Sequence, residues 1–343
     1  MTGTDSTTRA IDVGGPWFDE LSVGQVSPPV PALTLTDGHA ALHQAIVGDR
    51  LALALDAGLS AAVTGSTRPL AHPALIWDVA IGQSTLLTER VIGNLFYRGL
   101  VFHRAPAIGD TLRTSTEVVA LRQNSRKPGR AATGLAVLRV RTSVLEDRRV
   151  LDFWRCAMLP LSDSGGQTDH ADALDAIPSE LDPAALGEAI AGWRLELLGD
   201  ARDASGARAP APGTVWRVEG GDVVSAAPEL ARMTLNVATA HHDARASGRR
   251  LVYGGHTIGI AAAHVSRVLP ELVTFVAWHG CDHTGPVLEG DTLSSEIELE
   301  RVQPLSGHDG AALVHLRCRV SATRGEPAQT VDVLDWRPIG VIA

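Results

Sequence analysis

The chain has 343 residues, of which 45% are hydrophobic and 20% charged, and its formal net charge is −9. This composition is typical of an ordinary globular protein with enough apolar material for two domains of about 150 residues each. The negative charge argues against nucleic acid or an anionic membrane as the main partner.

The start of the chain and its cysteines indicate the compartment. Residues 1–15 are small and polar with no apolar run, so we expect a disordered tail rather than a signal peptide. No uncharged apolar stretch reaches the roughly 18 residues of a membrane-spanning helix. The cysteines, Cys156, Cys281 and Cys318, are widely spaced and form no C-x-x-C motif. This pattern favours the cytoplasm over an oxidising compartment, and argues against a disulfide framework or structural zinc site.

The first half of the chain predicts two helices followed by three strands. Residues 37–48 and 74–87 have the apolar spacing of helices. Residues 111–123 and 135–145 alternate apolar and polar side chains, which is typical of half-buried antiparallel strands. A third strand is expected at 151–156, "LDFWRC". Joined by hairpins, the three strands make an antiparallel meander.

The second half repeats this pattern. Residues 162–212 predict an acidic linker with one short helix around 183–191, and helical stretches follow at 228–240 and 256–269. Three motifs of the first half then recur in order, displaced by 181, 178 and 182 residues: "IGDTLRTSTEV" as "EGDTLSSEIEL", "AVLRVRTSV" as "VHLRCRVSA", and "LDFWRC" as "VLDWRP". The nearly constant displacement indicates two copies of one module.

The predicted fold class is therefore α+β, with a long antiparallel sheet wrapped around a central helix in each copy. We place the first copy at 16–161 and the second at 213–343. We expect the tryptophans Trp77, Trp154 and Trp336 to fill the core.

These motifs resemble those of the MaoC-like acyl-CoA dehydratases and hydratases in their double-hotdog form. The resemblance lies in "WFDELSVGQV" (17–26) and in both GDTL motifs, and it extends over the chain apart from the tail and linker. The stretches "NVATAHHDA", "GRRLVYGGHTIGIA" and "CDHTGPVLEGDTL" are similar to those of mesaconyl-CoA hydratases, also called β-methylmalyl-CoA dehydratases. The implied reaction is reversible addition of water to an enoyl-CoA, best matched by mesaconyl-C1-CoA and β-methylmalyl-CoA.

The resemblance also assigns catalytic residues. His241 occupies the position of the family's histidine and is expected to be the general base, but Asn236 stands five residues earlier where the family has an aspartate. Either Asn236 or Asp243 would polarise His241. Gly254 and Gly255 precede a helix, where free N–H groups can hold the thioester oxygen. No metal or redox cofactor is implied, and coenzyme A is part of the substrate.

Substrate contacts are less sharply indicated. Tyr253 and His256 adjoin the two glycines, and His256 is either a substrate contact or a structural residue. A substrate carboxylate requires a cation, and with Lys127 as the only lysine the candidates are arginines: Arg98, Arg104, Arg249 and Arg250. The basic residues of 122–130 contact either the phosphates of coenzyme A or only solvent.

Several alternatives stay open. In the first copy Asp49 is followed five residues later by Ala54 rather than a histidine, so this copy is predicted to be a binding half without catalytic machinery, with Asp49 an exposed turn residue. His242 is expected to face solvent. Residues 278–285, "WHGCDHTG", alternate like a strand, which argues against a metal cluster. Other functions are an (R)-specific hydratase of another acyl-CoA, a thioesterase, or a non-catalytic acyl-CoA-binding protein. The chain either acts alone or forms a homodimer.

Overall fold

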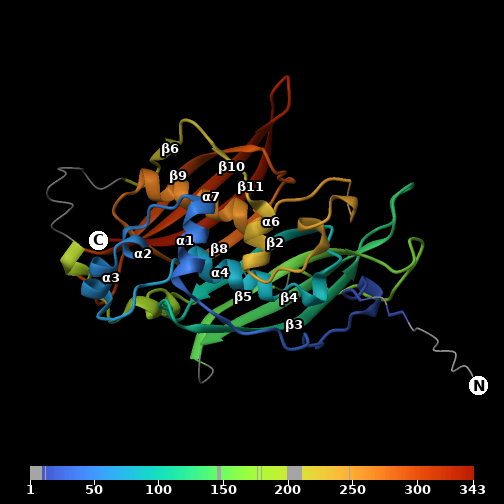
Figure 1. Ribbon diagram of the computed structural model, residues 1–343, viewed down its shortest axis with the longest axis horizontal. Coiled ribbons are helices and arrows are strands. Elements are labelled where there is room, and N and C mark those ends of the chain that lie inside the picture. The colour runs from blue at the N-terminus through green and yellow to red at the C-terminus, as the bar shows by residue number, and fades with distance from the viewer. Residues whose placement is uncertain are drawn as a thin grey trace, which may run out of the picture.

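The computed structural model describes residues 10–11, 13–144, 148–175, 177–178, 180–198, 211–246 and 248–343. Most of the predicted tail, residues 1–9 and 12, and part of the predicted linker, 199–210, lie outside this set. Within it, one large antiparallel sheet runs through both copies in the order β1-β3-β4-β5-β2-β8-β11-β10-β9-β6, with β7 paired to β9 (Figure 1). The predicted α+β class is confirmed.

The first copy supplies the following elements: β1 (Leu33–Thr34), α1 (Asp37–Val47), α2 (Ala52–Leu55), α3 (Ala57–Thr64), α4 (Pro73–Gln83), β2 (Gly93–Phe102), β3 (Thr111–Gln123), β4 (Thr133–Val144) and β5 (Arg148–Pro160). The second supplies β6 (Val215–Arg217), β7 (Asp222–Val223), α6 (Ala227–Met233), α7 (Gly254–Val268), β8 (Leu272–His283), β9 (Thr292–Pro304), β10 (Ala312–Arg324) and β11 (Gln329–Ile342). The two predicted meanders are therefore present as β3-β4-β5 and β9-β10-β11.

The two copies meet at a strand pair that the sequence pattern did not indicate. Strands β2 and β8 follow the central helices and pair antiparallel, with Tyr97 opposite Cys281 and Arg98 opposite Gly280. This pairing joins the two meanders into one continuous sheet. Because the sheet has no break between the copies, the boundaries proposed for them stay a prediction.

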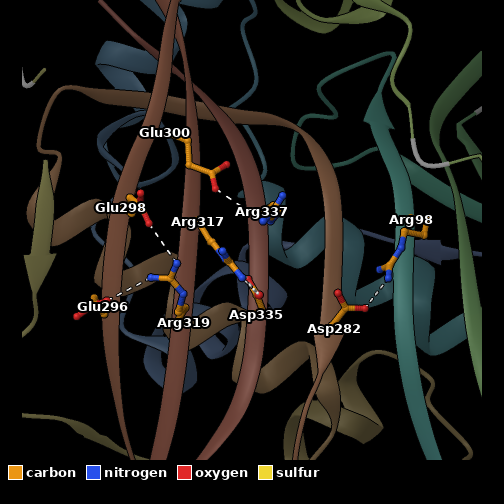
Figure 2. A network of polar contacts seen from close by, with 9 residues as sticks. All are labelled: Arg98, Asp282, Glu296, Glu298, Glu300, Arg317, Arg319, Asp335 and Arg337. Carbon is orange, nitrogen blue, oxygen red and sulfur yellow. Dashed lines mark hydrogen bonds and ion pairs between the residues drawn. The ribbon is translucent and has the colours of Figure 1, made fainter. Parts of the chain in front are cut away.

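Alternation along these strands separates a buried face from an outer face. Figure 2 shows the outer face, where ion pairs run from strand to strand. They comprise Glu296 and Glu298 with Arg319, Asp335 with Arg317, Glu300 with Arg337, and Asp282 with Arg98 across the seam.

The central helices α4 and α7 pack against each other on the buried face, beside α1 (Figure 1). Every residue of α4 is buried, which explains why apolar residues predominate on all sides of the helix, with Asp78 and Gln83 as the exceptions. Trp77 of α4 contacts Trp278 edge to face with a centroid distance of 4.9 Å, and Trp336 completes this cluster. The core positions predicted for Trp77 and Trp336 are confirmed.

The prediction for Trp154 is wrong. Trp154 is only half-buried, and the Arg139 guanidinium lies over its ring, while the adjacent Arg155 points inward and is 3% exposed. In β11 the order is reversed, with Trp336 buried and Arg337 outside. The strand pairings show why: Phe153 lies opposite Val140 as Trp336 lies opposite Cys318, so Phe153 is the equivalent of Trp336. The repeat of "WR" is therefore out of register by one residue, and the equivalent of Arg155 is Pro338.

Two helical predictions also need correction. The stretch 228–240 is helical only as α6, because Leu235 adopts a positive φ of 59° that an α-helix cannot contain. The residues after it, including Asn236, therefore lie in an irregular segment, which contains one 3₁₀ turn at Thr239–His241. The predicted helix at 183–191 consists of two 3₁₀ turns, Pro183–Ala185 and Glu188–Ile190. Among the described residues, no helix is long and apolar enough to cross a membrane.

Candidate active site

A cavity of about 100 Å³ lies where the second copy's irregular segment meets the seam. The second copy contributes Asn236, His241, Tyr253, Gly254, Thr257 and His283 to its wall, and the first contributes Ile81, Thr85, Asn94, Tyr97 and Arg155. The structure thus brings together four of the predicted site residues, Asn236, His241, Tyr253 and Gly254. Their functional roles stay predictions.

His241 is held in one tautomer. Its Nδ1 lies 3.0 Å from the carbonyl oxygen of Leu251, which can only accept, so Nδ1 carries the proton and donates it. Nε2 then keeps a free lone pair. Burial of the ring lowers the pKa of His241 to about 4, and Arg155 acts in the same direction. The imidazole is consequently neutral near pH 7, as a general base must be.

Asn236 is oriented as a donor toward the cavity. Its Oδ1 accepts a hydrogen bond from the Ala238 N–H at 2.9 Å, and its Nδ2 is buried without a partner among the described residues. His242 is half-buried rather than solvent-facing as predicted, because its Nε2 bonds to the Asn236 carbonyl at 2.7 Å. His242 therefore fixes the backbone that carries Asn236.

The glycine pair begins the 15-residue helix α7, whose first N–H groups have no partner within the helix. Gly254 faces the cavity, and a Cβ there would lie 2.8 Å from His283 Nε2. Gly255 faces the opposite way, and a Cβ there would overlap Oδ1 of Asp78 in α4. Glycine is thus required at both positions by close approach, and Gly254 presents its backbone to the cavity.

Behind α7 lies a buried polar cluster that reaches the cavity wall only through Tyr253. His43 Nε2 contacts Asp78 Oδ2 at 3.1 Å, and Asp78 O accepts the Tyr253 hydroxyl at 2.8 Å. His256 is fully buried here, and neither of its ring nitrogens has a partner among the described residues. Burial lowers the pKa of His256 to about 4. The structure therefore places His256 in the core rather than in the wall of the cavity.

The remaining predicted residues lie elsewhere. Asp243 is bound by Arg245, whose guanidinium holds the pKa of the Asp243 carboxyl at about 2, and it does not line the cavity. Arg250 pairs with Glu289, and the neighbouring Arg249 is exposed; neither belongs to the cavity wall.

The two arginines of the first copy are also outside the cavity. Arg98 is on the outer face of β2, where it pairs with Asp282 at 2.6 Å (Figure 2), because the adjacent Tyr97 points inward. Arg104 is exposed and borders a separate polar hollow beside Arg68 and Arg148. None of the four predicted arginines therefore lines the wall.

Asp49 differs from its prediction as an exposed turn residue. It is 1% exposed, it accepts a hydrogen bond from the Leu51 N–H at 2.7 Å, and its Oδ1 lies 3.2 Å from Nε2 of His72. The sequence comparison also took Ala54 as the first copy's counterpart of His241, and the structure corrects this. The bridges Leu70–Ala107 and Leu251–Leu288 are equivalent in the two copies.

This equivalence identifies the counterpart of His241. His241 bonds to Leu251 in the second copy, and Ser60 Oγ accepts from the Leu70 N–H at 2.9 Å in the first. Ser60 therefore stands where His241 stands, and the first copy has no histidine at that position.

The cavity residues that were not predicted include Asn94, Tyr97, Arg155 and His283, whose side chains can donate or accept hydrogen bonds. Asn94, Tyr97 and Arg155 come from the first copy. His283 Nε2 is buried without a partner among the described residues, and burial and His241 lower the pKa of His283 to about 4. The resemblance of "CDHTG" was the one signal for His283. In the described part of the chain, no group of three or more His, Cys, Asp or Glu is arranged to hold a metal ion.

The basic hairpin at 122–130 borders a larger hollow of about 590 Å³, lined in part by Arg126, Lys127 and Arg130. Ile92 borders both this hollow and the cavity with His241. The two spaces are thus neighbours, as binding of one long ligand would require.

Comparison with known proteins relates the chain to two curated enzymes. The β-methylmalyl-CoA dehydratase of Chloroflexus aurantiacus is 26% identical over 334 residues, covering 91% of this chain and 89% of the relative. The mesaconyl-CoA hydratase of Cereibacter sphaeroides is 25% identical over 297 residues, covering 83% of each. No family model matches the chain.

Solved structures extend the relation. RV0216, a conserved hypothetical protein from Mycobacterium tuberculosis described as a double hotdog, is 51% identical, with a TM-score of 0.87 over 96% of this chain and 99% of that one. A putative MaoC domain protein dehydratase from Chloroflexus aurantiacus superimposes with a TM-score of 0.82 at 23% identity, over 97% of this chain and 99% of that one.

Proposed function

Because the chain belongs to the MaoC-like double-hotdog family, we propose that it is a hydro-lyase that adds water to the double bond of an enoyl-CoA and removes it again. The observation that carries this proposal is the neutral His241, whose free Nε2 shares a cavity with the start of helix α7. The best substrate is mesaconyl-C1-CoA, with β-methylmalyl-CoA as product, as the names of the two curated relatives suggest.

The proposed reaction uses one base. Nε2 of His241 takes a proton from water while the water oxygen attacks the β-carbon, and the electrons of the double bond move onto the thioester oxygen. The N–H of Gly254, at the positive end of the α7 dipole, stabilises the resulting enolate. No carboxylate is among the described residues of the wall, so the imidazolium itself returns the proton to the α-carbon. Both new bonds then form on the same face, which is syn addition.

Asn236 has a supporting role in this scheme. Since its Oδ1 is already bound to the Ala238 N–H, only its Nδ2 is available to the reactants. It cannot accept a proton, so it positions water or the thioester oxygen by donating a hydrogen bond. The aspartate of related enzymes would instead place a second negative charge beside the enolate.

The test is hydration of mesaconyl-CoA and of crotonyl-CoA, which is measured as the decrease in absorbance of the enoyl thioester. We expect His241→Ala to lower kcat by about 10²–10⁴-fold, the usual contribution of a general base. His308→Ala, in the turn between β9 and β10, is the matched control and keeps wild-type kcat. Full activity of His241→Ala would refute the assignment of the base. Release of free coenzyme A thiol without hydration would identify a thioesterase instead.

A further inference from the structure

Arg155 is a buried cation without a counter-ion. It is 3% exposed, and within the residues that the structure describes it forms no ion pair with Asp or Glu. Its hydrogen-bond acceptors are neutral: Nη2 donates to Ser84 O at 2.9 Å and to Thr88 Oγ1 at 2.5 Å, and Nη1 reaches Asn94 Oδ1 at 3.5 Å. Burying an unpaired charge costs several kcal/mol, so such a residue needs an explanation.

Part of the guanidinium has a structural role. Ser84 ends helix α4, and an arginine that binds the last carbonyl groups of a helix stabilises that end. This contact occupies only Nη2. Nε is buried with no partner among the described residues, and Nη1 has a single long contact, so donors remain where Arg155 lines the cavity. Capping of α4 therefore leaves half of the guanidinium unexplained.

The second copy shows that the fold does not need a cation at this position. The equivalent inward-pointing side chain of β11 is Pro338, which is buried, because Asp152 and Asp335 occupy the same position of the two meanders. An apolar side chain thus suffices at this position of the second copy. In the first copy the same position borders the cavity with His241 and holds a charge instead.

We propose that Arg155 binds a carboxylate carried by the acyl group of the substrate, so that the preferred substrate is an enoyl thioester of a dicarboxylic acid. This inference rests on the proposed hydratase function and names its specificity residue. Arg155 and His241 line the same small cavity, so a carboxylate bound by the guanidinium is held beside the attacked β-carbon. A phosphate of coenzyme A does not fit there, because the pantetheine arm separates the phosphates from the thioester.

The decisive measurement is the ratio of kcat/KM for mesaconyl-CoA to that for crotonyl-CoA, which lacks the carboxylate. We expect Arg155→Gln to lower kcat/KM for mesaconyl-CoA by about 100-fold or more while changing that for crotonyl-CoA by less than about threefold. Arg155→Lys, which keeps the charge, recovers part of the ratio. Arg139→Gln, on the neighbouring strand β4 but paired outside with Asp152, is the matched control and leaves the ratio unchanged.

The outcomes separate this proposal from the hydratase function. Equal losses on both substrates, or a wild-type protein that does not prefer mesaconyl-CoA, would overturn the role of Arg155 and leave the hydratase function standing. If the wild-type protein hydrates neither substrate, the proposed function fails, and calorimetry with the saturated succinyl-CoA and butyryl-CoA decides the carboxylate site. Tighter binding of succinyl-CoA that Arg155→Gln abolishes supports the site, and equal binding of the two thioesters refutes it.

Discussion

The buried His256 makes the free energy of unfolding depend on pH, and substitution of this one residue isolates its contribution. It is fully buried in α7, its ring nitrogens have no partner among the described residues, and its pKa is lowered from 6.5 to about 4. The main cause is burial, with a further contribution from His43, while Glu289 acts in the opposite direction. In the unfolded chain the imidazole is in water and takes up a proton at its ordinary pKa.

The sign follows from the folded pKa lying below the unfolded one. Below about pH 6.5 the unfolded chain binds a proton that the folded protein excludes, so the free energy of unfolding falls as the pH decreases. It stops falling on account of His256 once the pH is below about 4 and both states are protonated. With about 1.4 kcal/mol for each pKa unit, the contribution lost is about 2 kcal/mol at pH 5 and about 3 kcal/mol at pH 4.

Urea unfolding of the wild-type protein and of His256→Gln, at several pH values between 7.5 and 5, measures this effect. The substitution changes stability at every pH, so the informative quantity is the difference between the two free energies of unfolding. We expect this difference to shift by about 2 kcal/mol in favour of His256→Gln on going from pH 7.5 to pH 5. Other buried histidines, such as His283 and His315, titrate in both proteins and cancel. A difference independent of pH would show that His256 is protonated equally in both states, and the reasoning from burial would fail.

Two further predictions concern the site. His241 must be neutral to act as a base, and its pKa is about 4. In a pH–rate profile measured within the stable range, kcat/KM for hydration should therefore decline as the pH falls through about 4 and not near 6.5. A decline centred at 6.5 would contradict the burial of the His241 ring. Gly255→Ala should lower the free energy of unfolding by about 1–3 kcal/mol or more, because its Cβ overlaps Asp78. The control Gly192→Ala, with open space around the residue, should change it by no more than about 0.5 kcal/mol. Similar thermal melting of both variants would contradict the close approach of α7 to α4.

Most of the sheet could be predicted because it depends on a local signal. In β3 and β9 apolar and polar residues alternate, and this period of two is set by the strand itself. The pairing of β2 with β8 was not predictable in the same way. Consecutive residues are buried in the second half of β2 and along most of β8, so these sequences do not alternate between apolar and polar residues. Their contact also joins residues about 180 positions apart.

Arg155 shows how a small error in register hides a functional residue. The motif "WR" occurs in both copies, and aligning Trp154 with Trp336 predicts a buried tryptophan and an exposed arginine in each. In the structure only β11 follows that arrangement, while β5 is displaced by one residue and turns its arginine inward. A displacement of one residue exchanges the two faces of a strand. The shared motif "WR" therefore predicted the wrong one of its two residues to be buried in β5.

His241 and Asn236, by contrast, were found from the resemblance alone, and their geometry depends on contacts that no local pattern contains. The tautomer of His241 is set by the Leu251 carbonyl, and the orientation of Asn236 by the Ala238 N–H. Both depend on the turn at Leu235, just after the end of α6, whose positive φ is unusual for leucine and is not signalled by the sequence.

The asymmetry between the copies arises at several positions together, which explains why the fold keeps one cavity rather than two. At the start of α4, Pro73 occupies the place of Gly254 and has no N–H to offer to an oxyanion, and Ser60 replaces His241 as the residue bonded to the following strand. The corresponding space has shrunk to about 10 Å³, with Ile190 from the linker in its wall. No single substitution in the first copy would therefore restore base, oxyanion donor and space together. The first copy contributes instead through β2 and β5, whose Tyr97 and Arg155 complete the wall opposite His241, so each half of the chain supplies what the other lacks.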